Sequence, residues 1–168
     1  MELIRPNNRY LDSYIEASNE YDLYSLNVEV LFDSPETVIQ KSIDYENGVN
    51  MKPGYVRATT FWLIDNHEFI GEINIRHELN DNLLRYGGHI GYGIRSSMRN
   101  KGYGTKMLQM ALVYCKETLK INRVLVTCDE NNICSRRVIE KNSGILENII
   151  INYTERGIVK TRRYWIDL

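Results

Sequence analysis

The amino-acid sequence predicts a single α/β domain built around one sheet of mixed strand direction. Its 168 residues, of which 43% are hydrophobic and 26% charged, are enough for one compact core. The hydrophobic period is helical in the first third, becomes that of strands between residues 56 and 94, and then alternates between the two. Internal repeats and low-complexity stretches are absent from the sequence, so one domain over residues 1–168 is expected.

The first third is expected to hold one strand and two helices. Residues 2–5 predict a short edge strand. Apolar side chains at helical spacing around Tyr14 predict the first helix. Ser34-Pro35 predicts the N-cap and first position of the second helix. Residues 47–55 are rich in glycine and proline and predict the loop that closes this region.

The middle of the chain is expected to form three strands. Residues 56–64 are rich in β-branched and aromatic side chains, and Asp65-Asn66 after them predicts a hairpin turn. Residues 69–75 alternate apolar and polar side chains, which is typical of a half-buried strand. A third strand is expected over residues 89–94.

The second half alternates helices and strands. Residues 105–119 predict an amphipathic helix, and Val124-Leu125-Val126 a strand buried on both faces. Residues 132–141 predict a short helix that Gly144 ends. Residues 145–153 and 158–166 predict a final hairpin turning at residues 155–157.

Composition excludes several classes of protein. The net charge of −1 argues against a general nucleic-acid binder, which needs a positive excess. No apolar run approaches the roughly 18–20 residues that span a bilayer, so no membrane partner is expected. The N-terminus lacks the apolar core of a signal peptide. Three cysteines without CxxC spacing indicate reduced thiols in a cytoplasm and no metal site.

The segment that carries chemistry is a strand, a glycine-bearing turn and the start of a helix. Gly102 and Gly104 allow a curled backbone whose amide groups, with the positive end of the helix, favour a phosphate or pyrophosphate. Arg99, Lys101 and Lys106 add positive charge. The spacing of neither a P-loop nor a dinucleotide-binding GxGxxG motif is present.

The pattern R-x-x-G-x-G over residues 99–104 resembles the acyl-CoA pyrophosphate loop of the GNAT superfamily of N-acetyltransferases. Residues 88–94 resemble that family's splayed fourth strand, and residues 131–144 are similar to its N-x-x-S-x-x-[VL]-x-E-K-x-G helix. The resemblance covers essentially the whole chain and points to a bacterial subgroup of predicted acetyltransferases. It implies a central, mostly antiparallel mixed sheet of six to seven strands flanked by about four helices.

The resemblance also implies acetyl-CoA as co-substrate, with no metal, and assigns the residues that bind it. Tyr92, Gly93 and Ile94 would offer backbone groups to the pantetheine arm, Asn132 would hydrogen-bond it, and Ser135 would lie near the thioester sulfur. The residues expected to wrap the pyrophosphate are Arg99, Asn100, Lys101, Gly102, Tyr103, Gly104 and Thr105. A Gly104→Val change is expected to fill the space of the pyrophosphate, and so to abolish CoA binding while the fold stays largely intact.

The sequence offers candidates for the catalytic base and none for the catalytic acid. Many family members carry a tyrosine as general acid where this chain has Ile139, so the acid is not identified. His89 lies one residue from the position at which other members carry a base, on the opposite face of a regular strand. It is a candidate base, and a hydrogen-bonded structural histidine is the competing interpretation. Glu72 and His77 are further candidates.

The implied function is acetyl transfer to a primary amine by direct attack in a ternary complex. A catalytically degenerate acyl-CoA-binding sensor or partner module is the alternative, and a nucleotide-phosphate-binding domain is a third. The acceptor, small molecule or peptide, stays open, as does a homodimer. Five tyrosines are candidates to line an acceptor pocket, or to pack at the core edge: Tyr10, Tyr14, Tyr21, Tyr24 and Tyr45.

Overall fold

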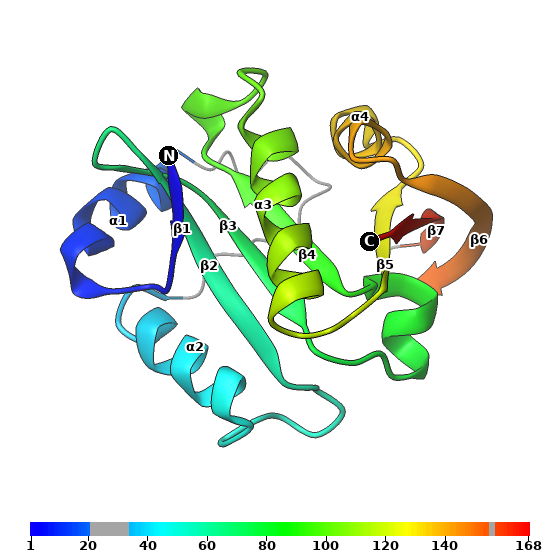
Figure 1. Cartoon of the computed structure of the whole chain (residues 1–168), viewed down its shortest axis with the longest axis horizontal. Helices are drawn as coiled ribbons and strands as arrows, with labels where there is room; N and C mark the ends of the chain where they lie inside the picture. The colour runs from blue at the N-terminus through cyan, green and yellow to red at the C-terminus, as the bar shows by residue number, and fades with distance from the viewer. Residues whose placement is uncertain (21–33, 155–156) are drawn as a thin grey trace.

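The computed structural model describes residues 1–20, 34–154 and 157–168 of the chain, which form one seven-stranded sheet with helices on both faces (Figure 1). The strand order across the sheet is β1-β2-β3-β4-β5-β7-β6. The strands are β1 (Glu2–Ile4), β2 (Ala58–Asp65), β3 (Glu68–Arg76), β4 (Ile90–Ile94), β5 (Arg123–Asp129), β6 (Ile145–Thr154) and β7 (Gly157–Asp167). The α-helices in the described ranges are α1 (Leu11–Asn19), α2 (Val38–Asn47), α3 (Tyr103–Glu117) and α4 (Ile133–Lys141). The predicted order of elements and fold class are confirmed.

The sheet consists of two antiparallel parts that meet in one parallel pairing. β1 to β4 pair antiparallel in sequence, and β5, β7 and β6 form a second antiparallel set. Between the two sets, β4 and β5 run parallel and are joined in register at Ile90 and Val126 alone. Helix α3 provides the crossover that a parallel pair needs.

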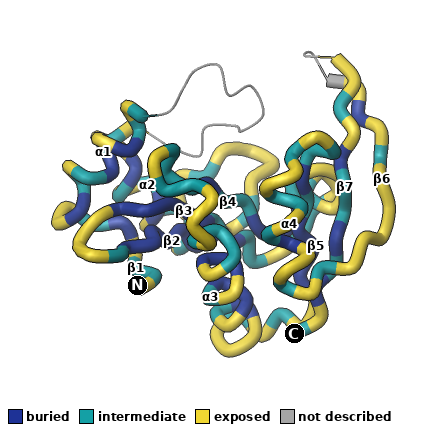
Figure 2. The backbone as a smooth tube through the Cα atoms, turned by 90° about the horizontal axis from the view of Figure 1, so that it is seen from above, coloured by how far each residue is buried: buried dark blue, intermediate teal, exposed yellow. Residues whose placement is uncertain are grey.

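Two apolar clusters hold the helices to the sheet. The larger lies under α3, where Met107, Leu108 and Ala111 are fully buried against β2, β3, β4 and β5. The smaller lies on the other face, where Tyr14 of α1 stacks on Trp62 of β2 with 4.8 Å between ring centroids. Figure 2 shows the buried residues concentrated along the central strands, whereas β6 at the edge is largely exposed. Both faces of the central sheet are therefore covered.

Several local predictions need correction. Helix α2 begins at Val38, because residues 34–37 form a turn in which the Ser34 carbonyl accepts from the amide of Val38. β3 is buried on both faces, since α1 covers the side expected to be solvated. The first hairpin turns at Asn66 and His67, which adopt positive φ. Most of the expected turn at residues 155–157, and two of the tyrosines, Tyr21 and Tyr24, lie outside the described residues.

Candidate functional site

The central feature is the stretch of β4 beyond Ile90 that does not pair with β5, which is called the gap below. The amide of Arg76 donates to the carbonyl of His89, and the amide of Arg95 donates to the carbonyl of Ile70, both at 2.8 Å. Because backbone groups alternate in an antiparallel pair, the odd-numbered residues of β4 pair with β3. The backbone groups of Tyr92 and Ile94 therefore face β5, whose ladder with β4 is confined to Ile90.

The backbone groups of Gly93 face the other neighbouring strand from the one expected. Its register partner is Glu72 of β3, so its backbone groups face β3 and not the gap. What Gly93 contributes to the gap region is the lack of a side chain beside Tyr92. The expectation that its backbone contacts an extended ligand in the gap is corrected for this reason.

The gap leads to the N-terminus of α3. Gly102 is the N-cap residue with φ of +87°, a conformation that favours glycine, and a Cβ there would meet no atom within 4 Å. The amide of Lys106 donates to the carbonyl of Gly102 at 3.2 Å and so begins the hydrogen bonding of the helix. The preceding amides of the first turn lack partners within the helix, which fits an anionic group.

The loop before α3 is held by an ion pair. Arg95 donates through Nε to Glu20 at 2.6 Å, and the Ser97 amide donates to the other carboxylate oxygen at 3.1 Å. Burial opposes ionisation of Glu20, but hydrogen bonds from Ser97 and Arg95 outweigh it and hold its pKa below the usual value. The end of α1 thereby fixes the start of the loop.

The loop's predicted ligand-binding residues differ in what their side chains do. Arg99 Nε lies 3.4 Å from the Ile94 carbonyl, and Lys101 Nζ lies 3.5 Å from a methionine sulfur. Asn100 has φ of +61°, so the loop carries strain there. The Tyr103 hydroxyl donates to Asp65 at 2.9 Å and ties α3 to the first hairpin. The Thr105 carbonyl accepts from Asn142, which joins α3 to α4.

Gly104 lies where α3 approaches α4 closely. A Cβ at this position would lie 3.2 Å from Cγ2 of Val138 on α4 and 3.7 Å from Cγ1 of Ile94. Gly104 therefore faces α4 and β4, whereas the open space lies beside Gly102. The expectation that valine at position 104 leaves the fold intact is corrected, because its side chain enters the α3–α4 contact.

The start of α4 brings two hydroxyl groups together beside the gap. Asn132 caps α4, with its Oδ1 accepting from the Ser135 amide at 3.0 Å. The Tyr92 hydroxyl lies 2.9 Å from Ser135 Oγ and donates to the Ser135 carbonyl at 3.3 Å. Burial raises the pKa of Tyr92 well above its usual value, and that of the nearby Cys128 thiol to about 11. The Tyr92 side-chain contact was missed, because its partner lies 43 residues away.

His89 forms part of the joint between β4 and β5. Its amide donates to the Leu125 carbonyl at 2.7 Å, and its Nδ1 accepts from the Leu125 amide at 2.9 Å. The side chain is 7% exposed, and burial followed by the charge of Arg76 lowers its pKa to about 4. With Nδ1 occupied, Nε2 carries the proton of the neutral ring, so no lone pair is left for a base. This geometry favours the structural interpretation.

Gly88 explains why no base stands at the neighbouring position. Its φ is +61°, and a Cβ there would lie 2.6 Å from the Leu125 carbonyl oxygen. A side chain cannot enter without moving β5. The expected position for a base is thus closed by the approach of β5.

A carboxylate lies on the face of the sheet opposite α3. Glu72 is 5% exposed and accepts from Trp62 Nε1 at 2.9 Å. Its register partner across the β3–β4 pair is Gly93, which carries no side chain. Of the sequence candidates for a base, Glu72 lies one strand from the gap, opposite Gly93, whereas His89 lies at the end of the gap with its Nδ1 already occupied.

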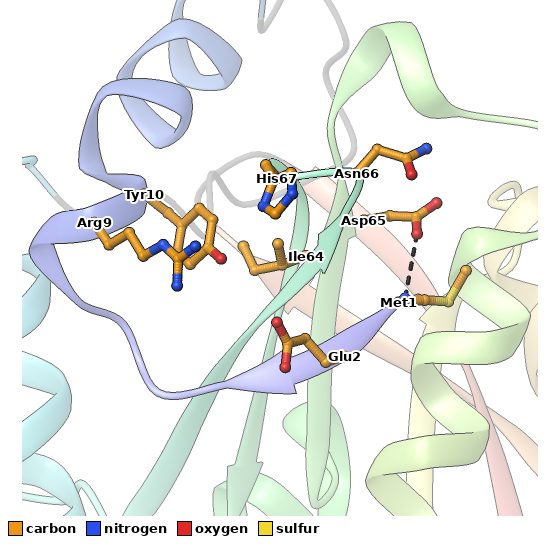
Figure 3. A pocket seen from close by; sticks show the side chains of 8 residues that line it. All are labelled: Met1, Glu2, Arg9, Tyr10, Ile64, Asp65, Asn66 and His67. Atoms are coloured by element: carbon orange, nitrogen blue, oxygen red, sulfur yellow. Dashed lines mark ion pairs between the residues drawn. The ribbon is translucent and has the colours of Figure 1, made fainter.

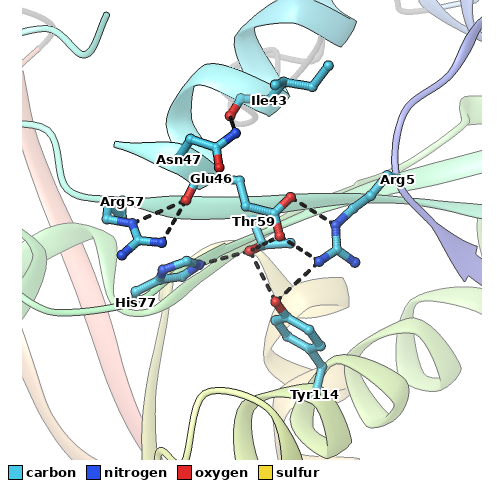
Figure 4. Close-up of polar contacts among 8 residues, drawn as sticks. All are labelled: Arg5, Ile43, Glu46, Asn47, Arg57, Thr59, His77 and Tyr114. Carbon is cyan, nitrogen blue, oxygen red and sulfur yellow. Dashed lines mark hydrogen bonds and ion pairs between the residues drawn. The ribbon is translucent and has the colours of Figure 1, made fainter. Parts of the chain in front are cut away.

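His77 belongs to a separate polar cluster at the other end of β3 (Figure 4). Its Nε2 lies 2.8 Å from Thr59 Oγ1, which also contacts Glu46 and Tyr114 at 3.3 Å each. Glu46 in turn pairs with both nitrogens of the Arg5 fork that face it. Burial and the charge of Arg57 lower the pKa of His77. The cluster fastens β1 and α2 to the sheet.

Other features lie away from the gap. A pocket of about 290 Å³ lies beyond β2, between β1, the start of α1 and the first hairpin; its lining includes Arg9, His67 and the terminal ammonium, which pairs with Asp65 at 3.3 Å (Figure 3). In the described ranges no three histidine, cysteine or acidic side chains group as metal ligands. None of the described helices combines the length and apolarity required to cross a bilayer.

Comparison with known proteins places these features in context. The profile of the acetyltransferase (GNAT) domain family matches residues 28–143. The Bacillus subtilis protein named as uncharacterized N-acetyltransferase YjdG is 22% identical, with 83% of this chain and 84% of the relative covered. A Salmonella typhimurium acetyltransferase that modifies the N-terminal serine of a ribosomal subunit protein superposes with a TM-score of 0.74 at 17% identity, over 99% and 94% of the two chains. A mutant of Vibrio cholerae spermidine N-acetyltransferase SpeG gives 0.68 at 15%, over 99% and 95%.

Proposed function

This chain belongs to the acetyltransferase (GNAT) family and is an acetyl-CoA-dependent N-acetyltransferase, and from that premise we propose that it acetylates a primary amine by direct attack within one ternary complex. The observation that carries the proposal is the gap between β4 and β5, which opens onto the N-terminus of α3. A long acyl donor that carries a pyrophosphate needs a strand edge for its extended arm and, at the end of that edge, a helix N-terminus for its phosphates.

The described residues fit such a donor. The pyrophosphate is assigned to the first-turn amides of α3 beside Gly102, with Arg99 and Lys101 nearby. The backbone groups of Tyr92 and Ile94 face the gap and match the amide groups of a pantetheine arm, as an added strand would. Asn132 already uses Oδ1 as the cap of α4, which leaves its amide NH₂ group for the arm.

We assign the acceptor to the opposite face of the sheet, at Glu72. A carboxylate beside Gly93 attracts an ammonium group and takes one of its protons to solvent, which frees the nitrogen lone pair to attack the acetyl carbonyl carbon. The nitrogen then loses a second proton, again through the carboxylate, as the amide forms. Trp62 holds the carboxylate through its indole N–H, so the group is oriented before the amine arrives. Glu72, and not His89, is therefore our candidate base.

Amines of two kinds are modified by proteins of this fold: the N-terminal serine of a ribosomal protein and spermidine. Both are cationic before transfer. We propose a cationic primary amine as the acceptor class for this chain, on the strength of the Glu72 carboxylate. We also propose a cytoplasmic location, supported by three cysteines that form no disulfide.

Two variants of the site test this proposal. Wild-type protein is incubated with acetyl-CoA and a panel of amines that includes spermidine and a serine-terminated peptide, and released thiol is measured. We expect amine-dependent release, reduced about 10²–10⁴-fold by Glu72→Gln, which keeps an acceptor for Trp62. The matched control is the double variant Glu72→Gln with Asn74→Asp, which moves the carboxylate to the next residue on the same face of β3. This double variant should release thiol as slowly as Glu72→Gln alone.

The proposal would be contradicted if the wild-type protein binds CoA but releases no thiol with any amine in the panel. That result would favour the alternative of a binding module. Full activity of Glu72→Gln would remove the base assignment alone.

A further inference from the structure

The gap has a closed end, and Tyr92 lies midway between that end and the start of α3. The gap begins at Ile94 beside the start of α3 and ends at the Ile90–Val126 pair. Four residues of strand span about 13 Å, since a strand rises roughly 3.3 Å per residue. If the pyrophosphate lies at α3, as in the proposed function on which this inference rests, the arm passes Tyr92 on its way to the closed end.

The side chain of Tyr92 is directed to the α4 side of the gap. It packs with the core under α3, and its hydroxyl reaches Ser135 Oγ at 2.9 Å. The contact with the Ser135 carbonyl, at 3.3 Å, makes Tyr92 a donor already in this structure. Cys128 of β5, 8% exposed, borders the same place. A phenolic O–H thus lies beside the middle of the gap, oriented by the first turn of α4.

The usual position for an acidic hydroxyl is not available in this chain. Ile139, on the next turn of α4, is fully buried in the core, and its side chain and carbonyl approach within 3 Å of where a Cβ at Gly144 would lie. No hydroxyl can come from that residue. Tyr92 supplies one from the opposite wall, on β4.

We propose that Tyr92 is the proton donor to the sulfur of CoA as the acetyl group leaves it, with Ser135 as the residue that positions its hydroxyl. As the amine nitrogen forms its bond to the carbonyl carbon, the carbon–sulfur bond breaks and its electron pair stays on sulfur. The Tyr92 proton moves to that sulfur and gives the free thiol. The phenolate regains a proton from solvent through the Ser135 hydroxyl, and the proton lost by the amine goes to solvent through Glu72, so amine and thioester become amide and thiol.

Burial acts on both partners of the proton transfer: it weakens the Tyr92 phenol as an acid, and it disfavours the thiolate that receives the proton. It raises the pKa of Tyr92, so the hydroxyl stays protonated throughout the neutral range. The same surroundings disfavour a bare thiolate, because charge is costly where water is excluded. A hydroxyl that hydrogen-bonds the developing thiolate is then worth more than it would be in water.

The test measures the ionisation of bound CoA and needs no acceptor. Thiolate absorbance of the CoA complex is followed from pH 6 to 10, with the desulfo-CoA complex subtracted to remove tyrosine signals. A hydrogen bond from Tyr92 stabilises the thiolate, so Tyr92→Phe should raise the titration midpoint by about 1 to 2 pH units. Ser135→Ala should shift it in the same direction by less. The same Tyr92→Phe protein should lose about 10²-fold in kcat with KM for acetyl-CoA nearly unchanged.

Tyr164→Phe is the matched control. Tyr164 is 1% exposed and its hydroxyl also contacts α4, through Glu140 at 3.3 Å, but it lies on β7. Its removal should leave the CoA midpoint in place. If the midpoint of the CoA thiol titration is the same in Tyr92→Phe as in wild type, Tyr92 is not the proton donor, whatever the affinity for CoA. That result would leave the proposed acetyl transfer untouched. Failure of wild-type protein to bind CoA overturns the proposed function and this inference with it.

Discussion

The structure makes a quantitative prediction about His89, which joins β4 to β5 through its ring. Replacing it with asparagine removes the titrating group but keeps an acceptor near the position of Nδ1, so the Leu125 amide keeps its partner. If the histidine is structural, the change should alter how stability depends on pH and leave the pH dependence of turnover alone.

The magnitude follows from the pKa of His89, which burial lowers from 6.5 to about 4. Because the folded pKa lies below the unfolded one, folding favours the neutral ring. The stabilisation is complete above pH 6.5 and is lost as the pH falls toward 4. The full difference corresponds to about 3 kcal/mol, and about 2 kcal/mol of it should disappear between pH 7 and pH 5.

Urea unfolding at pH 7, 6 and 5 measures this directly. Wild type should lose about 2 kcal/mol more than His89→Asn over that range. Equal slopes for wild type and His89→Asn would refute the argument. So would a rise in kcat near pH 6.5 that disappears in the variant, because that would make His89 a base.

Three further predictions concern the helix starts that frame the gap. Gly102→Ala places a Cβ at positive φ, so unfolding free energy should fall by about 1 kcal/mol and calorimetric CoA affinity should drop; unchanged affinity would argue against a phosphate site there. Gly104→Val should lower stability by about 1–3 kcal/mol through its clash with Val138, and Val138→Ala in the same chain should restore part of it. Asn132→Ala should lower the free energy of unfolding by about 1 kcal/mol, because the cap of α4 is lost. Asn132→Asp should keep the cap, so any loss of CoA affinity measured by calorimetry in that variant would report on the amide NH₂ group.

The order of elements was predictable because it depends on local signals. The change from helical to strand period before β2, and the cap residue Asn132 before α4, each act within a few residues of chain. The start of α2 was placed too early because Ser34-Pro35 fits a turn as well as a helix start. Nothing in the local sequence distinguishes those two uses.

The roles of individual side chains in the site depended on contacts between distant segments. Gly104 was expected to make room for a phosphate, but the distance that matters is to Val138, on another helix. Tyr92 was expected to contribute only its backbone, because its hydroxyl partner is Ser135 of α4. The sequence places each residue on its element, whereas which residue it meets follows from how α3 and α4 pack on the sheet.

The narrow joint between β4 and β5 has a consequence for how the protein responds to its co-substrate. The halves of the sheet share one strand pair, and the His89 imidazole substitutes for a ladder bond next to it. A ligand whose amide groups bind Tyr92 and Ile94 would complete the missing ladder, and so would become a structural part of the sheet. Hydrogen exchange at those two amides would then be slow only while the co-substrate is bound. The strength of the contact between the two halves of the sheet would increase on binding and decrease on release in each catalytic cycle.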